Sequence, residues 1–96
     1  MMITLKPEEI ERMCKELDNY YQDAEKALCA NKIKTFNEAT GLASTIIEAN
    51  TILTAILDDE RKLGVNKERV ARMENLSEIG ARLHGKMQEL TVSLNQ

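Results

Sequence analysis

The sequence has few aromatic residues, few turn-forming residues and no tryptophan. Tyr20, Tyr21 and Phe36 are its only aromatic residues, and its 96 residues include one proline and four glycines. Strand-rich folds favour aromatic and β-branched residues and need many turns, so this composition argues against one. The core must instead be built from Leu, Ile, Met and Ala, which favour a small number of long helices.

A charge excess of either sign is also lacking. The 13 basic and 16 acidic residues leave a net charge of −3, which excludes a strongly basic nucleic-acid-binding chain and a polybasic membrane anchor. Residues 1–9 contain neither the basic nor the apolar region of a signal peptide. The low-charge run 36–57 is interrupted by Glu48, Asn50 and several hydroxyl residues, so it is a poor membrane span. We therefore expect a cytoplasmic protein.

The two cysteines give no sign of a disulfide bond. Cys14 and Cys29 fall in one predicted helix, where they are about 22 Å apart at 1.5 Å per residue. Sulfur atoms on residues that far apart cannot pair. We expect both thiols to be reduced, as is usual inside cells.

Three stretches of the sequence repeat apolar residues at alternating steps of three and four, the spacing of a buried helix face. They predict helices at about 7–30, 35–63 and 67–94. Pro7, followed by Glu8 and Glu9, is typical of a helix start. The seam residues are Ile10, Met13, Leu17, Tyr20, Ala24 and Ala27 in the first stretch, Phe36, Ala39, Ala43, Ile46, Asn50, Leu53 and Leu57 in the second, and Met73, Leu76, Gly80, Leu83, Met87, Leu90 and Leu94 in the third.

The link between the first two helices can be placed in two ways. Asn31 tolerates a left-handed helix end, and Thr35 followed by Glu38 has the spacing of a capping box. A competing break lies at Thr40 and Gly41, because glycine weakens a helix interior by about 1 kcal/mol. We prefer the earlier break, since the second seam keeps its phase through Gly41.

Gly64 and Asn66 indicate the second link, as a helix C-terminus and a helix N-cap. Short links between helices imply antiparallel neighbours. The predicted fold is therefore all-α: an antiparallel three-helix bundle with coiled-coil-like helices, running up-down-up as a single helical domain over residues 1–96.

The second predicted helix has a further apolar line on another side, which a lone three-helix bundle leaves partly uncovered. An uncovered apolar side favours association with another chain. We expect a homodimer, and contact with another protein, through this line. It consists of Leu42, Ala49, Ile52, Ile56 and Leu63.

Asn50 interrupts the second seam, and two interpretations stay open. A buried Asn at such a position often sets helix register or oligomeric state. Alternatively, its side chain points into a wet groove beside Thr51 and Thr54.

The sequence contains no pattern typical of a catalytic, cofactor-binding or metal-binding site. His84, the only histidine, has no Cys, Asp or Glu three or four residues away. A zinc or di-iron site is therefore unsupported, and we interpret His84 as a surface or boundary residue. A phosphate-binding glycine loop and a serine nucleophile motif are also missing. We expect a protein that is not an enzyme and needs no cofactor.

Basic residues gather around the second link, where they could contact phosphates. Acidic residues are interleaved with them, no aromatic residue is near to stack on a base, and the chain is acidic overall, which argues against nucleic-acid binding. The candidate phosphate contacts are Arg61, Lys62, Lys67, Arg69 and Arg72.

The leading functional hypothesis is a non-enzymatic interaction protein. Small helical bundles that self-associate and hold another protein serve as chaperones, assembly factors or modulators, and the comparison is one of architecture only. The alternative is a nucleic-acid-associated regulator that uses the basic residues around the second link.

Overall fold

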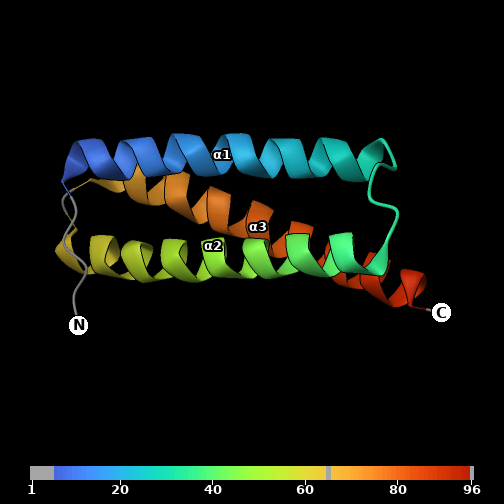
Figure 1. Cartoon of the computed structure of the whole chain (residues 1–96). Coiled ribbons are helices and arrows are strands. Elements are labelled where there is room, and N and C mark those ends of the chain that lie inside the picture. Colours follow the sequence, from blue (N-terminus) through green and yellow to red (C-terminus); the bar gives the residue numbers. More distant parts are fainter. Residues whose placement is uncertain (1–5, 65, 96) are drawn as a thin grey trace.

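The computed structural model describes residues 6–64 and 66–95, which form the helices and links of Figure 1. Helix α1 spans Pro7–Cys29, α2 spans Phe36–Leu63 and α3 spans Lys67–Leu94. Successive helices run antiparallel, and helix makes up 89% of the described residues, with no strand among them. The predicted all-α, up-down-up three-helix bundle is confirmed.

The link between α1 and α2 lies at the earlier of the two predicted positions. Asn31 has a left-handed backbone conformation with a φ of 56°, and the side-chain oxygen of Thr35 accepts a 3.1 Å hydrogen bond from the Glu38 amide. These features end one helix and start the next. Gly41 lies inside α2, so the competing break at Thr40 and Gly41 is wrong.

Gly64 and Asn66 have the predicted roles at the link between α2 and α3. Gly64 has a φ of 64° and its amide donates to the Glu60 carbonyl at 3.0 Å. The side-chain oxygen of Asn66 accepts a 2.9 Å hydrogen bond from the Arg69 amide. A left-handed glycine followed closely by an N-cap reverses the chain in a few residues, which brings α2 and α3 side by side.

The predicted seams of α2 and α3 form the centre of the core. Ile46 and Leu53 of α2 are fully buried, as are Met73 and Met87 of α3. The predicted phase of both helices is therefore confirmed. Phe36 is an exception, because its side chain is 41% exposed at the first turn of α2.

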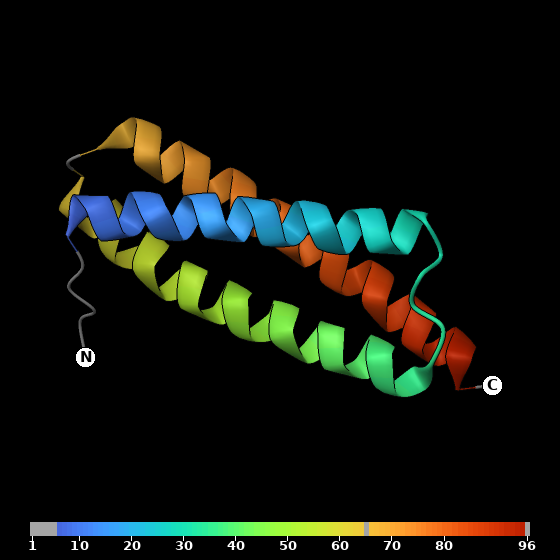
Figure 2. The same cartoon turned by 45° about the horizontal axis from the view of Figure 1, so that its top comes forward.

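The buried stripe of α1 agrees with the predicted seam only in part. Ile10 and Ala24 are buried as predicted, but Cys14 and Tyr21 are buried in place of Met13 and Tyr20, which are only partly buried. Helix α3 runs obliquely to α1 in both views, and in Figure 2 it crosses behind α1. The buried residues follow the same three-four spacing in a neighbouring phase, because Cys14 lies four residues after Ile10 and Tyr21 lies three residues before Ala24. Spacing alone therefore did not decide between the two phases.

The bundle is long and thin, with extents of 47 × 25 × 17 Å. Helices α2 and α3 form a closely packed pair, and α1 lies against one side of that pair (Figures 1 and 2). Two ion pairs tie α1 to α3, one between Glu11 and Arg72 and one between Glu25 and Lys86. The other side of the α2/α3 pair is not covered by α1.

Candidate interaction surface

Helix α2 is the most apolar helix of the bundle and is nevertheless largely exposed. Among the helices of the described residues, it alone is long and apolar enough to cross a membrane by length and composition, a test that core helices also pass. Only 22% of its most apolar window is buried, and the side chains of Ile47 and Ile52 are 47% and 54% exposed. The outside of α2 is therefore an apolar surface that the other two helices leave partly uncovered.

One groove, the α1/α2 groove, runs between α1 and α2. It has a volume of about 290 Å³. The partly buried stripe of α1 forms one wall of this groove, and the outer side of α2 forms the other. Its lining is apolar apart from one carboxylate: Met13, Glu16, Leu17, Tyr20, Ala49 and Ile52.

The predicted interface line of α2 lies only partly on this surface. Ala49 and Ile52 line the α1/α2 groove, Leu42 is partly buried nearby in the sequence, and Leu63 is 62% exposed at the end of the helix. Ile56 is 4% exposed and packs within the core. Its assignment to an exposed line is wrong, because the buried stripe of α2 widens toward Leu57 and includes Ile56.

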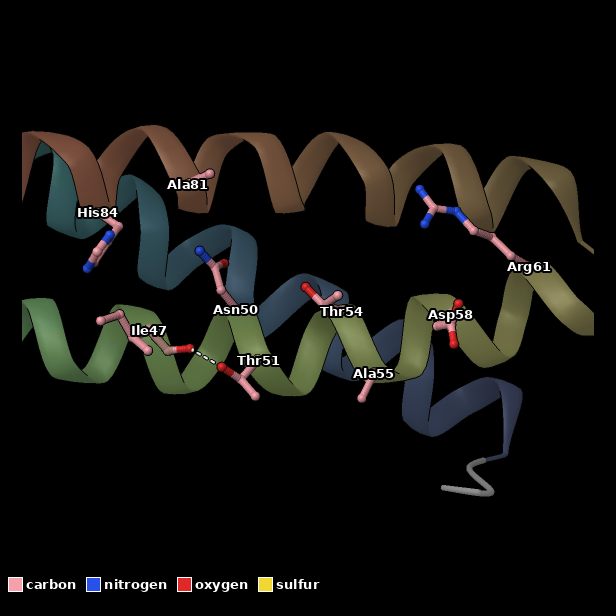
Figure 3. Close-up of a pocket in the computed structure, with 9 residues that line it drawn as sticks. All are labelled: Ile47, Asn50, Thr51, Thr54, Ala55, Asp58, Arg61, Ala81 and His84. Atoms are coloured by element: carbon pink, nitrogen blue, oxygen red, sulfur yellow. Dashed lines mark hydrogen bonds between the residues drawn. The ribbon is translucent and has the colours of Figure 1, made fainter. Parts of the chain in front are cut away.

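A second groove, the α2/α3 groove, lies on the open side of the α2/α3 pair, away from α1 (Figure 3). It consists of two adjoining hollows of about 660 and 880 Å³ that share Ile47 and His84. Small and hydroxyl-bearing residues make up most of its lining. Examples are Ala43, Ser44, Thr51, Thr54 and Ala55 from α2, and Ala81 and Gly85 from α3.

His84 lies at the junction of the two hollows, and Figure 3 shows its ring pointing from α3 toward α2. The side chain is partly buried, which places it at the boundary of the groove and not free on the surface. Among residues 6–64 and 66–95, no group of three His, Cys, Asp or Glu side chains is arranged to hold a metal ion. The imidazole nitrogens of His84 can hydrogen-bond to a group that occupies the groove.

Asn50 joins all three helices in a polar layer at the middle of the bundle. The hydroxyl of Tyr21 on α1 donates a hydrogen bond to Asn50 Oδ1 on α2, and Gly80 on α3 faces the same side chain. A Cβ atom on Gly80 would lie 2.6 Å from Asn50 Cγ and 2.7 Å from Nδ2, so glycine is the residue that leaves room for the amide.

Both open interpretations of Asn50 describe part of what the structure shows. Its oxygen is held inside the bundle by Tyr21, an arrangement that only one register of the helices allows. The same residue also lines the α2/α3 groove beside Thr51 and Thr54 (Figure 3). Burial, with a smaller contribution from Tyr20, raises the pKa of Tyr21 to about 12, so the phenol stays a neutral donor at physiological pH.

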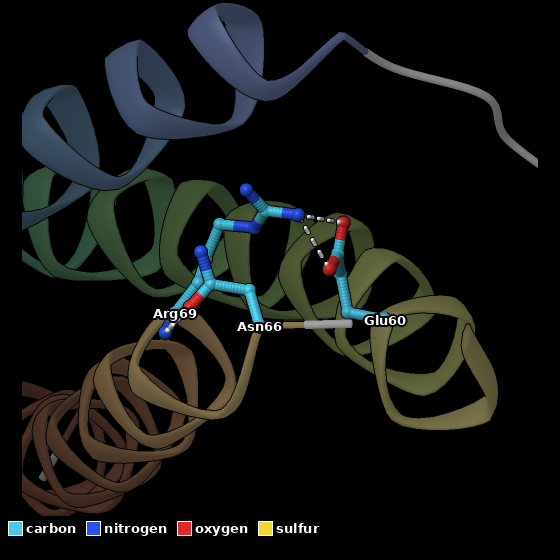
Figure 4. Close-up of polar contacts among 3 residues, drawn as sticks. All are labelled: Glu60, Asn66 and Arg69. Atoms are coloured by element: carbon cyan, nitrogen blue, oxygen red, sulfur yellow. Dashed lines mark hydrogen bonds and ion pairs between the residues drawn. The ribbon is translucent and has the colours of Figure 1, made fainter. Parts of the chain in front are cut away.

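Arg69, one of the candidate phosphate contacts, is held in a buried ion pair. Its Nη2 donates to both carboxylate oxygens of Glu60, at 2.9 and 3.1 Å (Figure 4), and Glu60 is only 5% exposed. The Arg69 Nε is buried without a hydrogen-bond partner in the described part of the chain. Arg69 is therefore already paired with Glu60 beside the link between α2 and α3.

Three further candidate phosphate contacts also face carboxylates. Arg61 pairs with Glu74 at 3.1 Å and Lys62 pairs with Asp58 at 3.2 Å, while Arg72 pairs with Glu11 of α1. Lys67 is exposed. These side chains do gather at one end of the bundle, but the neighbouring carboxylates offset much of their charge.

The two thiols differ in environment. Cys14 is buried in the core and Cys29 is exposed near the end of α1, and neither is in a disulfide bond. Burial is the main cause that raises the pKa of the Cys14 thiol, and the nearby charges of Arg72 and Glu11 act in opposite directions. Cys14 is therefore a core residue with low reactivity.

Sequence reasoning missed two buried polar side chains, Tyr21 and Glu60. It placed Tyr20, not Tyr21, on the seam of α1, although a tyrosine hydroxyl that enters a core needs a partner and Asn50 was the obvious one. It also left Glu60 unassigned, where three acidic residues precede a helix end and the dipole disfavours them. An acidic residue near a helix C-terminus, where the dipole disfavours it, indicates a nearby cation that pairs with it. For Glu60 that cation is Arg69.

No protein-family model, curated protein or solved structure matches this chain. Its function has to be inferred from the two grooves and from the charges around them.

Proposed function

We propose that this chain is a non-enzymatic protein-interaction module, a helical bundle that self-associates and holds a helix of another protein, in the manner of a small chaperone, assembly factor or modulator. One observation carries the proposal: the most apolar helix of the bundle has exposed isoleucines on two sides, Ile47 in the α2/α3 groove and Ile52 in the α1/α2 groove.

The energetic reason is the hydrophobic effect. Full burial of an isoleucine side chain stabilises a complex by about 1.5 to 3 kcal/mol relative to exposure. Ile47 and Ile52 are each about half exposed, at 47% and 54%, so each retains roughly half of that gain for a partner. Two such anchors on one helix, with few charges to desolvate between them, favour association.

The α1/α2 groove is the surface that best fits another protein. Its apolar walls from Leu17, Tyr20 and Ile52 suit the apolar face of an amphipathic helix, which docks through side chains spaced one turn apart. Glu16 at the edge would favour a partner helix with a basic residue flanking its apolar face.

Affinity capture from the source cells, with binding read by mass spectrometry, tests this proposal. Wild-type protein is compared with Ile52→Glu, which places a charge in the α1/α2 groove, and with Gln22→Glu, which adds the same charge at an exposed position of α1 outside the groove. We expect a partner that is captured by wild type and by Gln22→Glu and lost with Ile52→Glu. Equal capture by all three proteins would contradict the role of this groove.

The alternative of a nucleic-acid-associated regulator has less support. Four of the five candidate phosphate contacts already face a carboxylate, so few cations are available to release counterions from a phosphate backbone. We expect no binding to duplex or single-stranded nucleic acid tighter than about micromolar at physiological salt. Nanomolar binding that weakens steeply with salt and is lost with Arg72→Ala would favour the alternative.

A further inference from the structure

We propose that a second copy of this chain covers the α2/α3 groove, in a two-fold dimer in which each α2 lies antiparallel to the α2 of the other copy. This inference rests on the proposed function and names the surface used for self-association. It leaves the α1/α2 groove of each copy free for the other protein.

The charges along the groove suit a symmetric partner. In a two-fold dimer, residues near the axis meet their own copies, so a charge there faces the same charge. The middle of the groove has none: Ala43, Ser44, Ile47, Thr51 and Thr54 are all uncharged. A partner of a different sequence would not require this absence, whereas a second copy does.

The charged residues lie toward the two ends of the groove. Asp58 and Arg61 line the hollow at one end, where Arg61 also pairs with Glu74 of its own copy, and Glu89 lines the hollow at the other. With the two α2 helices antiparallel, Glu89 of each copy lies toward the end that contains Arg61 of the other, twice by symmetry. A dimer with its axis along the helices would instead bring Glu89 toward Glu89, which makes the antiparallel arrangement the favoured one.

The groove is large enough for such an interface. From Thr40 to Arg61 it follows α2 for about 32 Å at 1.5 Å per residue, and two helices are about 20 Å wide, which gives about 640 Å² before side-chain relief is added. A standard interface buries about 800 Å² per partner, an eighth of the 6459 Å² surface of this chain.

The shape of the groove also fits a helix that approaches closely. Gly85 has open space where a Cβ atom would be, with nothing within 4 Å, and Ala43, Ala55 and Ala81 are small. Ile47 of each copy is then the natural side chain to enter the groove of the other. A lipid surface is a poorer occupant, because Thr51, Thr54 and other hydroxyl groups line the same face.

Light scattering on the full chain at tens of micromolar tests the inference. We expect wild type to have a mass near twice 10.9 kDa. Ile47→Glu and Ser44→Glu should each raise the dimer dissociation constant at least a hundredfold and give monomers. The matched control is Ile52→Glu, an isoleucine of similar exposure in the other groove, which should stay dimeric. Circular dichroism checks that each variant is folded. Because Ile47→Glu and Ser44→Glu are independent changes, the inference can still be tested if one of them does not fold.

A charge exchange tests the antiparallel arrangement. Glu89→Arg alone should raise the dissociation constant about tenfold, which is about 1.4 kcal/mol, and the double variant Glu89→Arg with Arg61→Glu should restore it. A wild-type monomer overturns the inference, as does a dimer that Ile47→Glu and Ser44→Glu leave intact, or a monomer that binds lipid vesicles. If the wild type is a monomer and captures a partner that Ile52→Glu does not capture, only this inference is overturned. If the wild type is a dimer and captures no partner, only the partner-binding part of the proposed function is overturned.

Discussion

The inner and outer sides of α2 contain similar residues and have opposite surroundings. On the inner side, Ile46 and Leu53 have no exposed surface, while on the outer side Ile47 and Ile52 are each about half exposed. Each exposed isoleucine is the immediate neighbour of a buried residue. Hydrophobicity alone therefore does not distinguish a core position from an interface position on this helix, and the difference comes from where α1 and α3 lie.

Charge is scarce on both sides over residues 36–57, for a separate reason on each. On the inner side, a charge would have to be desolvated and paired, as Glu60 is by Arg69. On the outer side, a charge is hydrated and harmless to the fold, as the exposed Glu48 is, so the scarcity of charge there is not explained by folding. Uncharged residues on a solvated face are what an association surface requires.

The largest expected effect concerns the one charge that the inner side does contain. Glu60→Ala should destabilise the fold by about 3 to 5 kcal/mol, because it leaves the Arg69 guanidinium buried without its partner. Urea unfolding followed by circular dichroism measures the loss. Combining Glu60→Leu with Arg69→Met should recover most of it, since no charge is then buried. If Glu60→Ala costs less than about 1 kcal/mol, the pair is solvated and not part of the core.

An inner apolar residue should have a slightly smaller effect. Leu53→Ala should lower the free energy of unfolding by about 2 to 5 kcal/mol through lost burial and a residual cavity. Its neighbour Ile52, changed to Ala in the same experiment, should cost clearly less, because its side chain is 54% exposed. Equal losses would mean that the two sides of α2 do not differ as described.

The sequence predicted the sides of α2 and α3 that face the core, because regular spacing identifies a helix face whatever packs on it. It could not predict which outer side of α2 the first helix covers. That depends on how the three helices cross, which also decides that Cys14 and Tyr21 of α1 are buried in place of Met13 and Tyr20. The misplacement of Ile56 has the same origin.

The candidate site was predictable only in part. The scarcity of charge over residues 36–57 and the unusual Asn50 on the seam of α2 were visible in the sequence, and both belong to the surface described here. The contact of Asn50 with Tyr21 and Gly80 required the relative register of three helices, which local spacing does not provide. Pairing of the basic residues with acids on other helices, such as Arg72 with Glu11, was hidden for the same reason.

The polar layer of Tyr21, Asn50 and Gly80 lies between the inner and outer sides of α2, and substitutions there test how closely it is packed. Gly80→Ala should destabilise the fold by about 1 to 3 kcal/mol, because the added methyl group overlaps the Asn50 amide. In an Asn50→Ala background the overlapping atoms are gone, and the same change should be neutral or should stabilise the helix by up to about 1 kcal/mol. A double-mutant cycle from urea unfolding gives the coupling. Additive effects would show that Gly80 and Asn50 are not in contact.

Alkaline pH should act on the same layer. Because the pKa of Tyr21 is raised from 10.0 to about 12 in the folded state, the folded protein holds a proton that the unfolded chain releases. Stability should be unaffected by this group below about pH 10 and should fall between about pH 10 and pH 12, by up to about 2 kcal/mol. Tyr21→Phe should remove most of this decline, whereas Tyr20→Phe should remove less. A decline that is unchanged in Tyr21→Phe would have another source.

The smallest expected effect lies on the outer side of α2. Ile52→Glu should lower the free energy of unfolding by only about 1 kcal/mol, because the side chain is 54% exposed and glutamate is at least as good a helix former as isoleucine. Urea unfolding of this variant, compared with wild type at the same protein concentration, measures the change. A stable Ile52→Glu that no longer captures a partner would separate binding from folding at one residue. A loss above about 2 kcal/mol would instead place Ile52 in the core, and the contrast between the two sides of α2 would no longer hold.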